Sequence, residues 1–255
     1  MYNNEETLLD LRLQTLSKYV RKFILVESEF DHQGNYKDKF FNIENFKKYK
    51  DKIISLKINN FPSNLKGSWE RENFQRDYLS KAIENLQDDD YIIISDADEI
   101  PNLSKIKNIE KSKFTAFKQS NYCYKFNMKN ITYPDWYGSK LCKKKYLKSP
   151  QWLRNQKVKN YSFLKFFKIK WNIINNGGWH FSFLMYPEEI KKKIKAFAHD
   201  EFNKTEYLDV DKINKSIIEG LDLFDRNQKY IRVGLDKTFP KSIFDNKKKY
   251  QDWIV

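Results

Sequence analysis

The chain has 255 residues and a formal charge of +14, with a hydrophobic content of 40% and an aromatic content of 16%. This composition argues against a disordered chain, and the length allows a sizeable core. The two cysteines, Cys123 and Cys142, lack the spacing of a zinc site and are too few for a disulfide scaffold, and the sequence does not tell whether they pair. No signal-peptide pattern or membrane-spanning apolar run is present, so the sequence predicts a soluble, cytoplasmic protein.

The positive charge predicts attraction to polyanions, which include nucleic acids, anionic lipids and phosphate-bearing small substrates. Much of this charge lies in short lysine runs at 143–145, 191–193 and 247–249. Because such runs are usually solvated faces, we assign the larger share of the charge to that role.

Helices and strands alternate in the predicted first half. A capping-box pattern at Asn3 and Glu6 and leucines at helical spacing predict a helix over residues 5–18, and a second amphipathic pattern predicts one over 69–86. Short apolar runs predict strands at 23–26, 53–58 and 91–94. This alternation predicts an α/β fold, with a mostly parallel central sheet flanked by helices.

The second half has a different pattern. Irregular aromatic and polar alternation over 114–128 and 131–146 predicts shorter antiparallel strands, followed by a short helix from Pro150 and a strand over Phe163–Ile169. A further strand is predicted over 179–184, after a double glycine, with helices beginning at Pro187 and near Asp211. Without an internal repeat or linker, residues 1–255 are expected to form a single domain.

The most informative stretch is residues 90–101, where an apolar run with three isoleucines leads into Asp96, Asp98 and Glu99. Such a run is typical of a strand buried on both faces, and acidic residues at its end would lie in the ligand crevice of an α/β sheet. Carboxylates at i and i+2 of an extended segment point the same way, so both aspartates would face one Mg²⁺ or Mn²⁺. The alternative to a metal site is a polar turn after the strand. Because so short a motif recurs by chance, the motif alone favours the turn.

Two further groups of residues have open interpretations. Arg71 and Arg76 belong to a predicted helix. They would either form ion pairs on an exposed helix face or bind a phosphate in the crevice. From these residues alone, the exposed face is the favoured interpretation. A lone histidine such as His180 is more often a core residue, and it becomes a candidate ligand if Asp98 holds a metal. His199 and Glu201 would either cap a helix or place a carboxylate for proton abstraction.

Six segments occur in an order that spans roughly residues 2–225: residues 3–13, Val26-Glu27-Ser28, Trp69–Arg76, Ile94–Pro101, Gly178-Trp179-His180 and His199–Asn203. Together they resemble glycosyltransferase family 17, which includes the β-1,4-mannosyl-glycoprotein β-1,4-N-acetylglucosaminyltransferases that add bisecting GlcNAc. Several motifs in the same order are far more specific than D-x-D alone.

The resemblance implies a GT-A nucleotide-sugar fold, a UDP-sugar donor (UDP-GlcNAc), a divalent metal (Mn²⁺ or Mg²⁺), a glycan acceptor and inversion at the anomeric carbon. It places the family's D-x-D motif on Asp96 and Asp98 and its Gly-Trp-His motif on Gly178, Trp179 and His180. Residues 1–101 would form the nucleotide-binding half, and residues 102–255 would bind the acceptor and complete the metal site.

The chemistry of transfer from a nucleotide sugar agrees with this implication. The leaving group is a nucleoside diphosphate, and a metal bound to it would stabilise the negative charge that develops as the glycosidic bond breaks. We expect Asp98 to bind the metal directly, Asp96 to reach the ribose or a metal-bound water, and His180 to be the third protein ligand. The expected base for the acceptor hydroxyl is Glu201, followed by Asp200 and Asp135. Nucleotide contacts are expected from Arg71, Arg76, Arg154 and Glu27. Aromatic stacking on the acceptor is expected from Trp136 and Trp179, with Tyr137 and Trp152 also available.

Two other functions would also use features of this sequence. A magnesium-dependent nucleotidyl- or phosphotransferase would also use paired aspartates, but the chain lacks a glycine-rich phosphate cradle. A nucleic-acid-binding module fits the charge and the aromatic residues, but the acidic strand end argues against it, so no nucleic-acid partner is expected. Peripheral contact with an anionic membrane surface is a further hypothesis.

Overall fold

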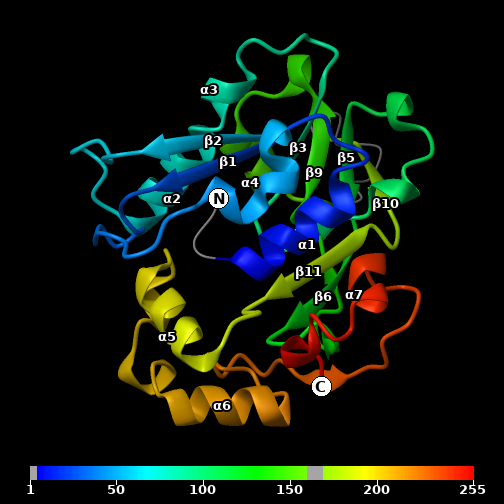
Figure 1. The fold of residues 1–255 in the computed structure, drawn as a ribbon. Coiled ribbons are helices and arrows are strands. Elements are labelled where there is room, and N and C mark those ends of the chain that lie inside the picture. The colour runs from blue at the N-terminus through cyan, green and yellow to red at the C-terminus, as the bar shows by residue number, and fades with distance from the viewer. Residues whose placement is uncertain (1–4, 160–168) are drawn as a thin grey trace.

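The computed structural model describes residues 5–159 and 169–255 and has a mixed α/β architecture (Figure 1). The described strands form a two-stranded sheet (β1-β2), a four-stranded sheet (β10-β5-β9-β3) and a six-stranded sheet (β12-β7-β6-β11-β4) with β8 paired to β6. Helix α1 lies between the upper strands and β11, whereas α5 and α6 lie at the lower end of the molecule (Figure 1).

The strands are β1 (Phe23–Ser28), β2 (Ile53–Ile58), β3 (Tyr91–Ile94), β4 (Glu99–Pro101), β5 (Phe114–Phe117), β6 (Gln119–Cys123), β7 (Met128–Asn130), β8 (Asp135–Trp136), β9 (Lys140–Lys143), β10 (Trp171–Ile174), β11 (Gly178–Ser182) and β12 (Tyr230–Arg232). The α-helices are α1 (Glu6–Leu16), α2 (Ser68–Asp77), α3 (Ser80–Ile83), α4 (Pro150–Asn155), α5 (Pro187–Ala196), α6 (Val210–Glu219) and α7 (Lys241–Asp245).

Several predicted elements are confirmed. The helix over 5–18 is α1, the strands at 23–26, 53–58 and 91–94 are β1, β2 and β3, and the helix beginning at Pro187 is α5. The predicted capping residue Asn3 lies outside the described residues, as does the predicted strand Phe163–Ile169 except for Ile169.

The prediction of a mostly parallel sheet is wrong. Among the described strands, the pairs β1–β2, β5–β10 and β6–β11 are parallel, whereas β3, β4, β7, β8, β9 and β12 all have antiparallel partners. The reason is that many connections between strands in the second half are short, and a parallel pair needs a longer crossover. Over a longer separation in the sequence, the central strand β3 also pairs antiparallel with β9, with Ile92 opposite Cys142.

Two further predictions need correction. Strand β3 is not buried on both faces, because Ile92 and Ile94 are buried while Tyr91 is exposed at its start. The helix predicted over 69–86 is two helices, since Leu79, Lys81 and Ala82 bond to carbonyls three residues back and tighten the chain between α2 and α3.

Helix α1 is central to the main core. Its leucines at 8, 9, 11, 13 and 16 are at most 2% exposed and belong to the same cluster as Ile100 of β4 and Phe181 of β11. Burying such side chains contributes roughly 1.5–3 kcal/mol each. Because the same helix carries Arg12, this packing also fixes a charged group against the turn before β4. No helix in residues 5–159 and 169–255 is long and apolar enough to cross a membrane.

Candidate active site

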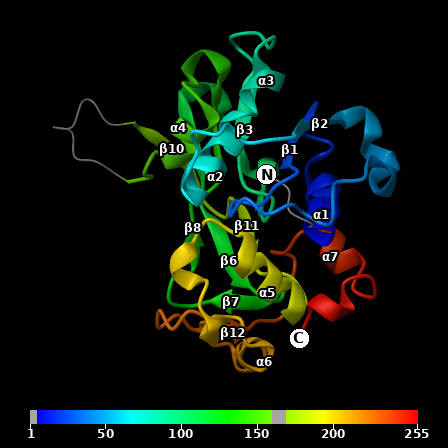
Figure 2. The same cartoon turned by 90° about the vertical axis from the view of Figure 1, so that its left-hand side faces the viewer.

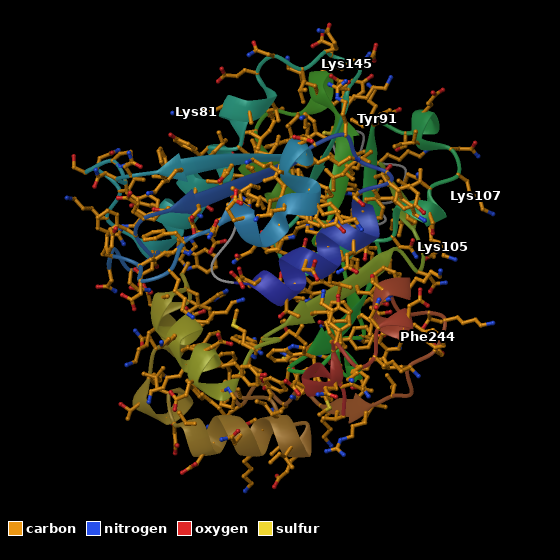
Figure 3. The ribbon with its side chains drawn as sticks, in the orientation of Figure 1. Lys81, Tyr91, Lys105, Lys107, Lys145 and Phe244 are labelled. Atoms are coloured by element: carbon orange, nitrogen blue, oxygen red, sulfur yellow. The ribbon has the colours of Figure 1, made fainter. Side chains whose placement is uncertain are left out.

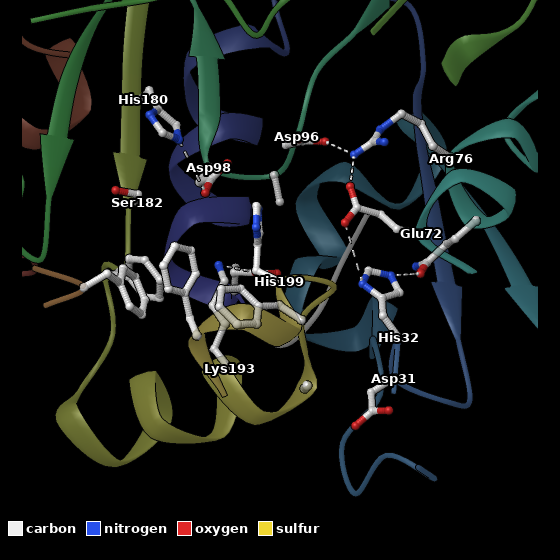
Figure 4. Close-up of a pocket in the computed structure, with 18 of the residues that line it drawn as sticks. Asp31, His32, Glu72, Arg76, Asp96, Asp98, His180, Ser182, Lys193 and His199 are labelled. Carbon is white, nitrogen blue, oxygen red and sulfur yellow. Dashed lines mark hydrogen bonds and ion pairs between the residues drawn. The ribbon is translucent and has the colours of Figure 1, made fainter. Parts of the chain in front are cut away.

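A cavity of about 320 Å³ opens beside the turn between β3 and β4. Figure 2 shows its frame: α2, the lower end of β11 and α5 follow one another from top to bottom of that face. Side chains from the 30–37 loop, α2, the turn, β11 and the segment from α5 onward line the cavity. Segments from both halves of the chain therefore meet there (Figure 4).

Arg12 of α1 holds the turn that carries the two aspartates. Its guanidinium donates to Ser95 Oγ at 2.5 Å and to the carbonyl of Asp96 at 3.2 Å, and also to the carbonyl of Glu99. The Glu99 amide closes the turn by donating to the Asp96 carbonyl at 3.1 Å. The aspartates thus lie on a pinned turn rather than on an extended strand, and their carboxylates contact different partners.

Asp96 lies between two arginines. Arg154 Nη2 is 2.6 Å from Asp96 Oδ2, and Arg76 Nη2 is 3.2 Å from Asp96 Oδ1 and 2.8 Å from Glu72 Oε1. Burial acts to raise the pKa of Asp96, but the charges of Arg154 and Arg76 outweigh it and hold the pKa well below its usual range. Asp96 is therefore ionised at neutral pH, with both oxygens engaged.

Asp98 faces His180 of β11 (Figure 4), with Oδ2 at 3.7 Å from Nε2. The backbone ties the two elements together, because the Phe181 amide donates to the Asp98 carbonyl at 2.9 Å. Burial acts to raise the pKa of Asp98, but the positive charge that His180 carries when protonated, and then Lys193, outweigh it, so the pKa is lowered.

The hydrogen bonds of Asn121 determine which nitrogen of His180 carries a proton. The Asn121 amide donates to the Tyr133 carbonyl at 3.0 Å, so its oxygen is the atom 3.0 Å from His180 Nδ1. Nδ1 must then donate, so a neutral ring carries its lone pair on Nε2, the nitrogen that faces Asp98. A lone pair and a carboxylate that face each other fit a cation between them, as does the donor set of one imidazole and one carboxylate.

Within the described residues, no three His, Cys, Asp or Glu side chains gather closely enough to hold a metal by themselves. Asp98 and His180 form a pair. Because Mg²⁺ is usually held by one or two protein carboxylates together with substrate phosphates and water, such a pair suits a metal that arrives with its substrate.

Glu99 supports the turn from behind. This fully buried carboxylate accepts from Trp136 Nε1 at 2.7 Å and pairs with Arg154 Nη1 at 2.8 Å. Trp136 in turn stacks on His180 with ring centroids 4.3 Å apart. A Cβ at Gly138 would lie 1.6 Å from Glu99 Oε1, so only glycine fits beside this pair.

The wall formed by α2 and the 30–37 loop is polar. His32 Nε2 lies 2.9 Å from Gln75 Oε1, and Gln75 Nε2 donates to the Val26 carbonyl at 3.2 Å. Burial, the largest cause, lowers the pKa of His32, although Glu72 opposes this effect. The wall thus offers a neutral imidazole beside the Arg76–Glu72 pair (Figure 4).

Lys193 of α5 brings a positive charge to the opposite wall. It pairs with Glu5 at 3.2 Å, and both side chains line the cavity. Burial acts to lower the pKa of Lys193, but Glu5 and then Asp98 outweigh it and raise the pKa. Lys193 is therefore charged at neutral pH and suits an anionic group beside Asp98.

Aromatic rings line the lower part of the cavity. They come from the segments on either side of α5 and from residue 224, and the closest pair, Phe202 and Phe224, stacks at 4.3 Å. The members of this wall are Phe183, Phe197, His199, Phe202 and Phe224. One side of the cavity is therefore charged and the other is apolar.

Comparison with known proteins bears on this site. The family model of Glycosyltransferase family 17 matches residues 1–230. The chain belongs to glycosyltransferase family 17. The predicted family is confirmed, and with it the prediction of a glycosyltransferase at the level of the family.

Relatives in this family share one segment with the chain. The human and rat proteins named beta-1,4-mannosyl-glycoprotein 4-beta-N-acetylglucosaminyltransferase are each 32% identical to it over 108 residues, and the mouse protein of that name is 31% identical. The match covers 39% of this chain and 20% of each relative. No solved structure gives a significant match.

The family 17 residues singled out in the sequence divide into two groups. The cavity is lined by Asp96, Asp98, His180, Arg76 and Trp136. The other predicted site residues are not among the described residues that line it: Glu27, Arg71, Arg154, Asp135, Tyr137, Trp152, Trp179, Asp200 and Glu201. Of these, Arg154 still reaches the site through its bond to Asp96.

The residues away from the cavity have structural partners. Glu27 accepts from the Phe41 amide at 2.9 Å and pairs with Lys37 at 3.2 Å, while Arg71 donates to the His32 carbonyl at 2.8 Å. Glu201 binds His199 Nδ1 at 2.7 Å, and it is His199 that lines the cavity.

The remaining predicted residues also have partners. Asp200 accepts from Ser68 Oγ at 3.0 Å, and Asp135 pairs with Lys118 at 2.8 Å. Trp179 is 7% exposed and donates to the Thr238 carbonyl at 3.0 Å.

The sequence analysis missed several residues of the site: Arg12, Glu72, Gln75, Glu99, Asn121 and Lys193. The motif segments contained signals for four of them, because Arg12, Glu72, Gln75 and Glu99 lie within the quoted stretches. Asn121 lies in an unremarkable context, and the pairing of β6 with β11 brings it to the site. Lys193 belongs to the lysine run at 191–193, and the predicted solvated face is wrong for this residue, because the packing of α5 turns it into the cavity.

Proposed function

We propose that the chain is a metal-dependent, inverting glycosyltransferase of GT-A type that transfers GlcNAc from UDP-GlcNAc to a hydroxyl group of a glycan. The observation that carries this proposal is the Asp98–His180 pair, 3.7 Å apart, with Nε2 directed at the carboxylate. Membership of family 17 supports the reaction class, and the printed name of the relatives supports GlcNAc as the sugar. In this proposal residues 1–101 bind the nucleotide, and residues 102–255 complete the site.

Asp98 and His180 would hold Mn²⁺ or Mg²⁺, with substrate phosphate oxygens and water as the other ligands. The bound metal would neutralise the negative charge that develops on the leaving diphosphate. Asp96, whose oxygens are engaged by two arginines, suits the ribose or a metal-bound water. Lys193 would place a second positive charge beside the same phosphates.

The nucleotide contacts follow from the same cavity. Arg76 is the proposed direct contact to diphosphate, and Arg154 would act by holding Asp96. Glu27 would position Lys37, which lines the cavity, and Arg71 would order the 30–37 loop through the His32 carbonyl.

Inversion in one displacement requires a base on the far side of the sugar ring. We propose Glu201, acting with His199, which lines the cavity, and next Asp200, which lies between these two residues in the chain. Burial is small at Glu201, and the hydrogen bond from His199 lowers the pKa of its carboxyl group, which keeps it ionised. Trp136 would then contact the acceptor from its position over His180.

The test is UDP release from UDP-GlcNAc with and without Mn²⁺. We expect release to need the metal and to fall by on the order of 1,000-fold in Asp98→Asn, because the charge that holds the metal is lost. Asp89→Asn is the matched control, since Asp89 is an exposed carboxylate that contacts Lys143 and Lys145 instead. Normal turnover in Asp98→Asn or in excess chelator would refute the proposal, and pyrophosphate as the product would indicate a nucleotidyltransferase.

Membrane contact is a separate proposal. Exposed lysines such as Lys81 and Lys145 project from the upper part of the molecule (Figure 3) and would approach anionic lipid. Vesicles that contain phosphatidylserine should then co-sediment the protein at low salt, and neutral vesicles should not. Equal co-sedimentation with both would refute this contact without affecting the catalytic proposal.

A further inference from the structure

Strand β11 separates the cavity at Asp98 from a second cavity. Successive side chains of a strand point to opposite faces, so His180 lies on the first cavity and its neighbour Trp179 on the second. The second cavity has a volume of about 700 Å³. We call it the Trp179 groove; its walls are the end of α1, residues 48–49, residues 102–105, the start of β11 and residues 237–246.

Lysines surround the Trp179 groove. Five exposed lysines line it: Lys18, Lys48, Lys105, Lys237 and Lys241. The acidic lining residue is Asp245, 3.4 Å from Lys241. The other four lysines make no ion pair with any residue in the described ranges. Figure 3 shows Lys105 at the outer edge of the molecule on the same side as α7. The groove therefore carries an uncompensated positive charge.

The uncharged lining has the chemistry of a carbohydrate site. Side-chain amides and hydroxyls that can bond to sugar hydroxyls alternate with the lysines: Asn102, Ser104, Ser120, Asn176, Ser242 and Asn246. The Tyr19 ring is 44% exposed and can cover one face of a sugar ring. Trp179 closes the inner end and, through its bond to the Thr238 carbonyl, fixes the segment that carries Lys237.

Nucleic acid is a poorer fit to the same groove. Single strands bind through successive bases that stack on several exposed rings. Among the aromatic side chains that line the groove, Tyr49, Trp179 and Phe239 are at most 9% exposed, which leaves Tyr19 as the exposed ring. The groove thus suits a ligand that needs positive charge and hydroxyl partners more than stacking.

We propose that the Trp179 groove is a second carbohydrate-binding site, specific for a glycan chain that carries negative charges. The lysines recognise the anionic groups, the amides and hydroxyls bind the sugar hydroxyls, and Tyr19 packs on a ring face. The groove lies on the opposite face of β11 from the Asp98–His180 pair, so this site stands independently of the proposed transfer reaction.

The test measures binding calorimetrically with four probes of similar length: a phosphorylated maltooligosaccharide, an oligogalacturonate, a neutral maltooligosaccharide and a single-stranded oligonucleotide. The first two distinguish phosphate from carboxylate as the source of charge. We compare the wild type with Lys18→Gln/Lys105→Gln, and with Lys148→Gln/Lys215→Gln as a control that removes the same charge from exposed lysines outside the groove. UDP release is measured for all three proteins, and we expect it to be unchanged.

At least one charged oligosaccharide should bind the wild type and the control alike and should bind the groove variant about tenfold more weakly. Its affinity should also fall as salt rises. Any of these results would overturn the proposal: equal binding of the neutral oligosaccharide, tighter binding of the oligonucleotide, or the same loss in both double variants. The last would indicate attraction by net charge alone, and absence of any binding would also overturn it.

Discussion

At the scale of single residues, the site depends on groups that orient other groups. Asn121 determines the tautomer of His180, and Glu99 holds Trp136 over the same ring. Neither side chain is itself a candidate to react with substrate. Residues that hold a metal ligand in place often affect metal affinity nearly as much as the ligand itself, because they fix the direction of the ligand's lone pair.

Asn121→Leu tests this role. The substitution removes the acceptor for His180 Nδ1, so the ring can turn or change tautomer, and we expect the Mn²⁺ concentration for half-maximal UDP release to rise on the order of 10-fold to 100-fold. Asn130→Leu is the matched control, because Asn130 is a buried asparagine of the same sheet that bonds to Gln228 and Tyr133 instead. It should lower stability without changing the metal requirement. A similar metal requirement in the two variants would show that Asn121 is only structural.

At the scale of elements, α1 links the core to the site. Its leucines are buried on β4 and β11, while Arg12 bonds to the turn that carries Asp96. Burial lowers the pKa of Arg12, and the nearby carboxylates, Glu99 first, counter this effect. A helix at the beginning of the sequence thus fixes residues that lie more than eighty positions later.

Arg12→Met should therefore affect both stability and activity. It leaves carbonyls of the turn without their donor and takes one of the positive charges away from Asp96 and Glu99, and we expect a loss on the order of 3 kcal/mol of unfolding free energy. Chemical denaturation measures this loss. Arg21→Met, at an exposed arginine, should change the free energy by less than about 0.5 kcal/mol. If the two variants were equally stable, the turn would not depend on Arg12.

At the scale of the whole molecule, the two cysteines lie in different sheets and are free and buried. Burial raises the pKa of each thiol to about 12. In the unfolded chain a thiol ionises near pH ~8.5. Because folding raises the pKa, the stability that the thiols contribute is complete below about pH 8.5 and is lost as the pH rises toward 12.

Thiol labelling checks this at pH 9. Both cysteines should react with Ellman's reagent at least ~100-fold more slowly in the native protein than in guanidinium chloride, because the thiolate is the reactive form. The denatured protein is the internal control, with two thiols titrated. Fast reaction of either thiol in the native state would contradict its burial.

Local patterns in the sequence were enough to predict several elements and the residue types of the candidate site. Apolar runs and helical spacing predicted α1, β1, β2 and β3, and the motif segments indicated Asp98 and His180. These features are local: they depend on side-chain periodicity and on short patterns of residue types. The same information predicted the family, which the family model confirms.

Only the tertiary structure decided how these pieces meet. The direction of β3 against β9 is set by pairing between segments about fifty residues apart, which no local pattern contains. The positions of the carboxylates depend on partners from other elements: Ser68 binds Asp200, and Arg154 binds Asp96. The opposite directions of Trp179 and His180 follow from alternation along a strand, but what each side chain meets follows from the packing of α1, α5 and α7 around it.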